Sequence, residues 1–171
     1  LYMQSNLQEI LVQENFSTFC TDFYSSNYID PLTGRSSQES MQTALRVCRQ
    51  FADTFSEEHC NILLYGDTGV GKTFLTHCIA KELMDHSYSV IYFSAVQLFE
   101  YFAKNTFGKR EGIESDVFDH VYDCDLLIID DLGTELSNSF TVSQLFVCLN
   151  ERILRRKATV ISTNLTLDDI N

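Results

Sequence analysis

From residue 61 onward, the hydrophobic positions of this chain fall into two alternating patterns. Short, nearly uninterrupted apolar runs predict buried strands, and stretches with an apolar residue every three or four positions predict amphipathic helices. The predicted strands are 61–65, 90–93, 126–130 and 158–163, and the predicted helices are 72–84, 96–103, 115–122 and one marked by Val142, Leu145, Phe146, Leu149 and Ile153. Apolar strands that alternate with helices are typical of a parallel sheet covered on both faces, so the sequence predicts an α/β fold.

A further helix is predicted before the first strand. Ser36 and Glu39 have the spacing of a capping box, in which two side chains satisfy free amides at a helix start. Apolar residues then recur at helical spacing, at Met41, Ala44, Leu45, Cys48, Phe51 and Phe55. We therefore divide the chain into an N-terminal segment, 7–60, and a core, 61–171. Residues 1–6 resemble a protease-site scar from an expression vector and are left out of the functional argument.

Composition narrows the class of protein. With 44% hydrophobic and 21% charged residues, the 171-residue chain is typical of a compact globular domain rather than a disordered one. The net charge of −12 excludes a general polyanion binder, so any contact with nucleic acid must be local. No apolar run approaches the roughly 18 residues that a membrane helix needs. Six scattered cysteines without a C-x-x-C pair predict free thiols in a reducing compartment, the cytoplasm.

The first core strand is followed by a glycine-rich segment that fits the pattern G-x-x-x-x-G-K-[ST] at every constrained position. Its residues are Gly66, Asp67, Thr68, Gly69, Val70, Gly71, Lys72 and Thr73. Glycines let backbone amides close around phosphate oxygens, and the helix that follows adds the positive end of its dipole. We expect Lys72 to bridge the β- and γ-phosphates of a nucleotide and the Thr73 hydroxyl to ligate Mg²⁺.

Acidic and amide side chains follow two other predicted strands. Asp130 ends the third strand, where its carboxylate can hold the Mg²⁺ shell, and Asp131 can polarise the attacking water. Glu135 is a weaker candidate for that base. Asn164 follows the last strand, and its amide can orient the water and sense the γ-phosphate. Lys72, Asp130 and Asn164 all come at carboxyl ends of parallel strands, where α/β sheets bind ligands.

These segments together resemble one family. Gly66–Thr73, Asp125–Glu135 and the stretch from Asn150-Glu151-Arg152 to Ile161-Ser162-Thr163-Asn164 look like the bacterial DnaC/DnaI helicase loaders of the AAA+ class, and the core is also similar to IstB-like ATP-binding proteins. The resemblance covers roughly residues 16–171. It implies a P-loop NTPase fold with a parallel five-strand sheet of order 5-1-4-3-2. It also implies binding of ATP and Mg²⁺, ATP hydrolysis, and Asn164 as the sensor-1 residue.

The same resemblance implies partners. Such loaders deliver a hexameric replicative helicase onto single-stranded DNA and self-associate as AAA+ oligomers. Candidate DNA contacts are Lys104, Phe107, Lys109 and Arg110, because cations pair with phosphates and aromatic rings stack on bases. A solvated loop over core aromatics is the competing interpretation, and the one that the sequence alone favours.

Parts of the loader pattern cannot be assigned. Residues 1–60 are too short for a full helicase-binding region, and no arginine finger or helical lid is found, so we interpret the chain as the ATPase core of a longer protein. Asp131 is one methylene shorter than the Glu that most AAA+ motors place there, so we expect slow hydrolysis.

Two alternatives and one further basic group remain. A transposition helper ATPase would have a similar core. A P-loop small-molecule kinase fits less well, because only Arg110 lies where an arginine-rich lid would be needed.

A second basic group lies at the end of the last predicted helix and consists of Arg152, Arg155, Arg156 and Lys157. Cations at this end complement the helix dipole, so we expect these side chains in solvent. A subunit contact through Arg155 or Arg156 is the alternative for this group.

Overall fold

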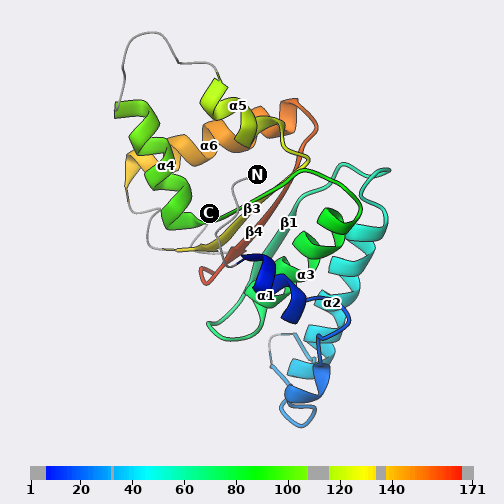
Figure 1. Cartoon of the computed structure of the whole chain (residues 1–171). Helices are drawn as coiled ribbons and strands as arrows, with labels where there is room; N and C mark the ends of the chain where they lie inside the picture. Colours follow the sequence, from blue (N-terminus) through cyan, green and yellow to red (C-terminus); the bar gives the residue numbers. More distant parts are fainter. Residues whose placement is uncertain (1–6, 32, 108–115, 134–137, 167–171) are drawn as a thin grey trace.

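A computed structural model describes residues 7–31, 33–107, 116–133 and 138–166. It shows a four-stranded sheet between two layers of helices (Figure 1), so the predicted α/β fold is confirmed. The strands are β1 (Ile62–Tyr65), β2 (Val90–Ser94), β3 (Leu126–Leu132) and β4 (Ala158–Thr163). The helices are α1 (Leu7–Gln13), α2 (Ser37–Asp53), α3 (Lys72–Asp85), α4 (Ala95–Phe107), α5 (Asp116–Asp123) and α6 (Ser139–Leu154), with a 3-10 turn at Thr21–Phe23.

The strand order is β1-β4-β3-β2, and every pair is parallel. These four strands stand in the order expected from the 5-1-4-3-2 arrangement. Its fifth strand has no counterpart among the described residues, where β1 is an edge strand. Because β1, β4 and β3 are neighbours, the segments that follow their carboxyl ends lie at the same edge of the sheet.

Two hydrophobic cores cover the two faces of the sheet, and β3 divides its side chains between them. Leu126 and Ile128 pack in the core with α1, α2 and α3. Leu127 and Ile129 pack in the core with α4, α5 and α6. This alternation is the two-residue period of a strand buried on both sides. Figure 1 shows the two helical layers on opposite sides of the sheet.

The capping box predicted for the first long helix is present. The Ser36 hydroxyl accepts from the Glu39 amide at 3.1 Å, and the Glu39 carboxylate accepts from the Ser36 amide at 2.8 Å. These bonds with Ser36 hold the pKa of Glu39 below its usual value. The helix α1, in contrast, was not predicted.

The last helix, α6, forms as predicted, but its surroundings differ from expectation. Of the five residues that marked it, Leu145 is buried, whereas Val142, Phe146 and Ile153 are exposed. Arg152, expected in solvent, is fully buried. Its guanidinium donates to the Thr159 hydroxyl at 3.0 Å and to backbone carbonyls of α5 and β4, so the interpretation as a solvated cation was wrong.

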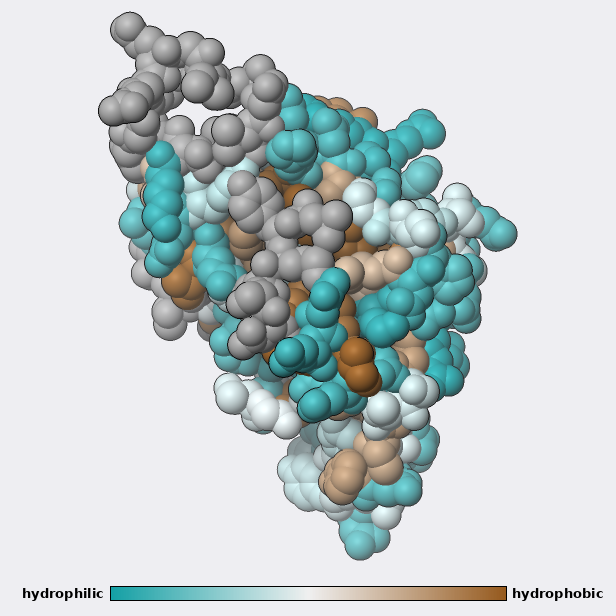
Figure 2. Space-filling view, in the orientation of Figure 1, coloured by the Kyte–Doolittle hydropathy of each residue, from teal (hydrophilic) through white to brown (hydrophobic). Residues whose placement is uncertain are grey.

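Most of the described surface in Figure 2 is hydrophilic, with hydrophobic residues in separate patches. None of the described helices combines the length and apolar character needed to cross a membrane. All six cysteines are free thiols, as predicted. Burial raises the pKa of Cys48, Cys78 and Cys148 to about 12, which leaves these thiols protonated and unreactive.

Candidate functional site

The phosphate loop, Gly66–Thr73, connects the end of β1 to the start of α3. Gly71 is the N-cap of α3 and has a φ of 98°, which L side chains rarely adopt. A Cβ at Gly71 would also lie 2.5 Å from the Tyr24 hydroxyl oxygen. That hydroxyl donates to the Val70 carbonyl at 3.1 Å, so the N-terminal segment holds the loop from outside.

Lys72 lies at the centre of the site and is 9% exposed. Its ammonium donates to the carbonyls of Gly66 at 2.7 Å and Asp67 at 2.8 Å. The third donor reaches Asn164 Oδ1 at 2.8 Å. All three donors of the ammonium are therefore used within the protein. A phosphate group on the loop would compete with these acceptors for the charge.

Thr73 and Asp130 form a pair of oxygen donors next to Lys72. Thr73 Oγ1 donates to Asp130 Oδ2 at 3.0 Å across the gap between α3 and β3. A hydroxyl and a carboxylate are the hard oxygen ligands that Mg²⁺ selects. The described residues hold no group of three His, Cys, Asp or Glu side chains for a metal. This donor set fits an ion that keeps water and phosphate oxygens in most of its shell.

Asn164 joins the loop to the second acid. Its Nδ2 donates to Asp131 Oδ1 at 2.9 Å while its Oδ1 accepts from Lys72. Asp131 and Asn164 are both exposed, so water can reach the side chains. The structure thus brings together Lys72, Thr73, Asp130, Asp131 and Asn164 from α3, β3 and the end of β4.

Three residues at the site were missed by sequence reasoning. Ser162 contacts both acids, and with Asp130, Asp131 and Asn164 it forms what we call the acidic edge. Tyr92 lies in β2 beneath Asp130, and burial, followed by the negative charge of Asp130, raises its pKa. The third is Tyr24. Ser162 is one of three hydroxyl residues in β4, so nothing local singled it out, and the partners of all three missed residues come from distant elements.

A cavity of about 580 Å³ adjoins the phosphate loop. It lies between α2, β1 and the loop, and sequence reasoning did not identify it. Its apolar side is formed by side chains that include Met41, Val47, Ile62 and Leu64, and Tyr24 and Lys72 line it as well. An apolar hollow beside a phosphate site has the shape and chemistry to take the flat base of a nucleotide.

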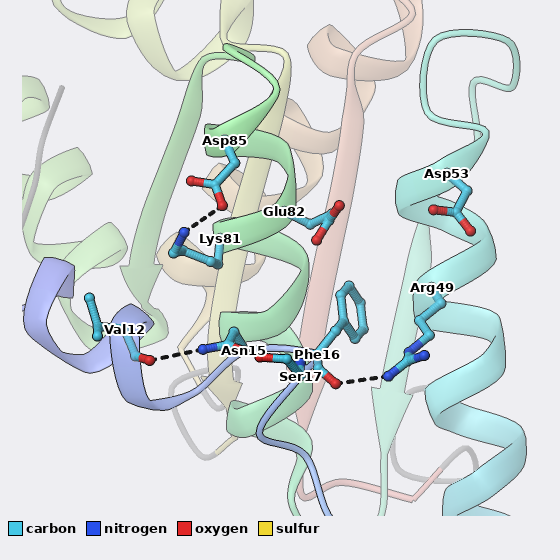
Figure 3. Close-up of a pocket in the computed structure, with 9 residues that line it drawn as sticks. All are labelled: Val12, Asn15, Phe16, Ser17, Arg49, Asp53, Lys81, Glu82 and Asp85. Atoms are coloured by element: carbon cyan, nitrogen blue, oxygen red, sulfur yellow. Dashed lines mark hydrogen bonds and ion pairs between the residues drawn. The ribbon is translucent and has the colours of Figure 1, made fainter.

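A second cavity, of about 680 Å³, lies between the segment after α1 and the helices α2 and α3 (Figure 3). No residue of the phosphate loop or the acidic edge lines it. Arg49 donates to the Phe16 carbonyl at 2.8 Å and covers its ring, and Lys81 pairs with Asp85. The Arg49 contacts fasten the N-terminal segment to α2, whereas the Lys81–Asp85 pair lies within α3, so we give this cavity a structural role.

The remaining predicted site residues are only partly described. Lys104 is exposed on α4 and pairs with Glu100 at 3.3 Å. Lys109, Arg110, Glu135 and the side chain of Phe107 lie outside the described residues. For the subunit-contact alternative, Arg155 pairs with Asp123 at 2.6 Å and lies over the Tyr122 ring within the chain. That contact occupies Arg155 without a partner subunit.

Comparison with known proteins agrees with this geometry. The curated replicative helicase loader DnaC of Escherichia coli (strain K12) is 23% identical over 132 residues, which is 77% of this chain and 54% of that protein. The chain therefore spans about half the length of the curated loader it matches. The crystal structure of DnaI is 22% identical with a TM-score of 0.70, over 98% of this chain and 79% of that one.

A third similarity is to the replication initiator DnaA bound to AMPPCP and single-stranded DNA, with a TM-score of 0.65 and 22% identity over 88% of this chain and 45% of that one. At such identities the two structural similarities establish the P-loop AAA+ fold. Residues 37–171, most of the chain, match the family described as IstB-like ATP binding protein. With this match and the assembled phosphate loop, the chain belongs to the IstB-like ATP-binding family.

Proposed function

We propose that the site hydrolyses ATP in a Mg²⁺-dependent reaction. The observation that carries this proposal is the convergence of Lys72, Thr73, Asp130, Asp131 and Asn164 at one edge of the sheet. A site that only bound nucleotide would need the loop, but it would not need a second acid next to an amide. Loop and acidic edge together supply the parts of a phosphoryl-transfer site.

Each side chain has a role that follows from its position. Lys72 leaves Asn164 and contacts the β- and γ-phosphates, which frees the amide of Asn164 to hold a water molecule. Asp131 accepts a proton from that water as it attacks the γ-phosphate. Thr73 and Asp130 hold Mg²⁺, which when bound neutralises charge on the phosphate oxygens.

The nucleoside lies in the cavity beside the loop in this proposal. Met41, Ile62 and Leu64 offer apolar surface to the base, and Tyr24 fixes the loop at the cavity mouth through Val70. Because these contacts are mostly apolar, they favour a purine by area rather than by specific hydrogen bonds.

Phosphate release tests the proposal directly. The purified chain is incubated with ATP and Mg²⁺, with ATP and EDTA, and with the Lys72→Ala variant in place of the wild type. We expect release only with wild type and Mg²⁺. Equal release with EDTA, or from the variant, would contradict it and point to a contaminating ATPase.

For the whole protein, we propose a loader in DNA replication: ATP state controls its grip on a hexameric replicative helicase and on single-stranded DNA. The similarity to DnaC and DnaI supports this assignment. In this proposal the full-length protein acts in the cytoplasm and self-associates as an AAA+ oligomer. A transposition helper ATPase is the second candidate, because its core would look much the same and the matched family is described only as ATP-binding.

A pull-down separates the two candidates. Full-length protein with ATP is mixed with the replicative helicase or with a transposase from the same cell. Capture of the helicase supports the loader, and capture of the transposase alone supports the transposition helper.

The DNA surface is tested separately at Lys104, Lys109 and Arg110. Neutralising all three should weaken binding to single strands of different sequence by a similar factor, because phosphate contacts carry no sequence information. Unchanged affinity for every strand would remove this surface from the proposal.

A further inference from the structure

The two acids of the site follow each other in β3, and this raises a geometric difficulty. Successive side chains of a regular strand point to opposite faces of the sheet. Asp130, like Ile128, faces the α3 side and meets Thr73 there. In a regular strand Asp131 would follow Ile129 into the core under α4 and α6. It is instead exposed and bonded to Asn164.

A bulge in β3 resolves this difficulty. Ile129 pairs with Ile161 and Leu132 pairs with Thr163, so three steps along β3 match two along β4. Leu132 takes the buried position in the α4–α6 core that Asp131 would otherwise fill. Asp131 is the extra residue, and its φ of 59° lies in the left-handed region that non-glycine residues rarely adopt. A bulge of this kind re-aims a side chain and often lies next to an active site.

Ser162 is the residue of β4 opposite this bulge, and it is only 1% exposed. Its hydroxyl donates to Asp130 Oδ1 at 2.5 Å and accepts from the Asp131 amide at 2.8 Å. A serine hydroxyl has one proton and two lone pairs, so it can make both bonds at once. The Asp131 amide, which the bulge removes from the hydrogen bonds between β3 and β4, thus donates to the Ser162 hydroxyl. The same hydroxyl also holds the carboxylate of Asp130.

We propose that Ser162 is a positioning residue for ATP hydrolysis that sets the direction of both acids. By donating to Asp130 Oδ1, the Ser162 hydroxyl keeps Asp130 Oδ2 directed at Thr73 and at the proposed Mg²⁺. By holding the Asp131 amide, it stabilises the left-handed conformation that turns the Asp131 carboxylate toward Asn164. This inference rests on the proposed ATPase function, but the geometric part of it does not need nucleotide.

Amide hydrogen exchange in the nucleotide-free protein tests the geometric part. We expect the Asp131 amide to be protected in the wild type and to exchange at least about tenfold faster in Ser162→Ala, because its acceptor is removed. Thr159→Val is the matched control: it removes another buried hydroxyl from β4, one that bonds Arg152 rather than the acids. An Asp131 amide that exchanges equally in wild type and Ser162→Ala would overturn the proposal.

Turnover and affinity test the functional part. In Ser162→Ala we expect phosphate release to fall about 10- to 100-fold, because small displacements of reacting groups have effects of this size. The affinity for ATP without Mg²⁺ should stay within about threefold, since the loop is untouched. Thr159→Val should lose thermal stability and keep its turnover per folded molecule. Loss of turnover in both variants would mean a structural role only and would overturn the proposal.

A second variant guards against misfolding. Ser162→Cys keeps the size of the side chain but has a weaker donor and acceptor, so its turnover should also fall while its melting temperature stays near wild type. Wild-type turnover in Ser162→Cys would overturn the role of the hydroxyl. If the wild type hydrolyses nothing, the proposed ATPase function fails. Two measurements then still test the positioning role of Ser162. One is the exchange rate of the Asp131 amide. The other is the increase in ATP affinity on adding Mg²⁺, which we expect in the wild type and not in Ser162→Ala.

Discussion

The phosphate loop and the acidic edge meet at one site, yet they are built differently. The loop is eight consecutive residues, Gly66–Thr73, held between a strand and the helix that follows. The acidic edge joins two residues of β3 to Ser162 and Asn164, which are more than 30 residues further along the chain. One region depends on local conformation, and the other depends on the register of two strands.

This difference separates the two tasks that we propose for the site, nucleotide binding and ATP hydrolysis. A local loop can cradle phosphate whenever β1 and α3 are in place, so nucleotide binding should tolerate changes elsewhere. The acidic edge acts only if the bulge in β3 is aligned with β4, so hydrolysis should be the more easily lost of the two. Changes in the loop should therefore affect affinity, and changes in the edge should affect turnover.

The largest effect is expected for Lys72→Ala. The variant removes the cation that we propose contacts the phosphates, and it leaves the carbonyls of Gly66 and Asp67 without their donor. We expect ATP affinity to fall by about 100-fold or more, which is the range for a buried charge pair. Binding of a fluorescent ATP analogue measures this. Lys81→Ala, on the same helix but paired with Asp85, is the control and should bind as wild type.

A smaller effect, on stability, is expected for Gly71→Ala. The backbone at Gly71 has a φ of 98°, which strains any residue with a Cβ, and the new Cβ would lie 2.5 Å from the Tyr24 hydroxyl oxygen. We expect the free energy of unfolding to fall by about 2–3 kcal/mol, against about 1 kcal/mol for Gly34→Ala, where φ is positive but no atom is near. Denaturant unfolding of both variants tests this comparison. Equal losses would mean that the contact with Tyr24 does not constrain the loop.

The smallest effect is expected for Tyr24→Phe. It removes only the hydrogen bond to Val70, which contributes about 1 kcal/mol. ATP affinity should fall by about two- to fivefold with turnover at saturation unchanged, because the loop loosens while the acids stay in place. Steady-state kinetics separate the two quantities. A fall in saturated turnover instead would link the N-terminal segment to the acidic edge.

The contrast between the regions also explains what sequence could predict. The loop was predicted residue by residue because its function depends on types and spacing within one short segment. Asp130 and Asn164 were found because an apolar strand ending in a polar residue points to the ligand edge of a parallel sheet. The four strands follow from the alternation of apolar runs with helical patterns, whereas their order was implied by the resemblance to the helicase loaders. The structure confirms the four strands and their relative order.

What sequence did not reveal depends on partners from other elements. Adjacent Asp130 and Asp131 give no sign of a bulge, because the extra residue shows only against the register of β4. Arg152 was interpreted as solvated because nothing local indicates that Thr159 and the end of α5 surround it. The hold of Tyr24 on the loop spans 46 residues and could not be inferred from spacing.

The central claim is that the acidic edge hydrolyses the ATP that the loop binds, and Asp131→Asn tests it most directly. The amide keeps the size and the contact with Asn164 but cannot accept a proton from water. Binding and single-turnover hydrolysis are measured on wild type, on Asp131→Asn, and on Asp125→Asn, a control acid at the opposite end of β3 that bonds Ser89. We predict affinity within about threefold of wild type and hydrolysis slower by at least about 100-fold in Asp131→Asn alone. Hydrolysis at the wild-type rate in Asp131→Asn would contradict the account and move the search for the base to Glu135.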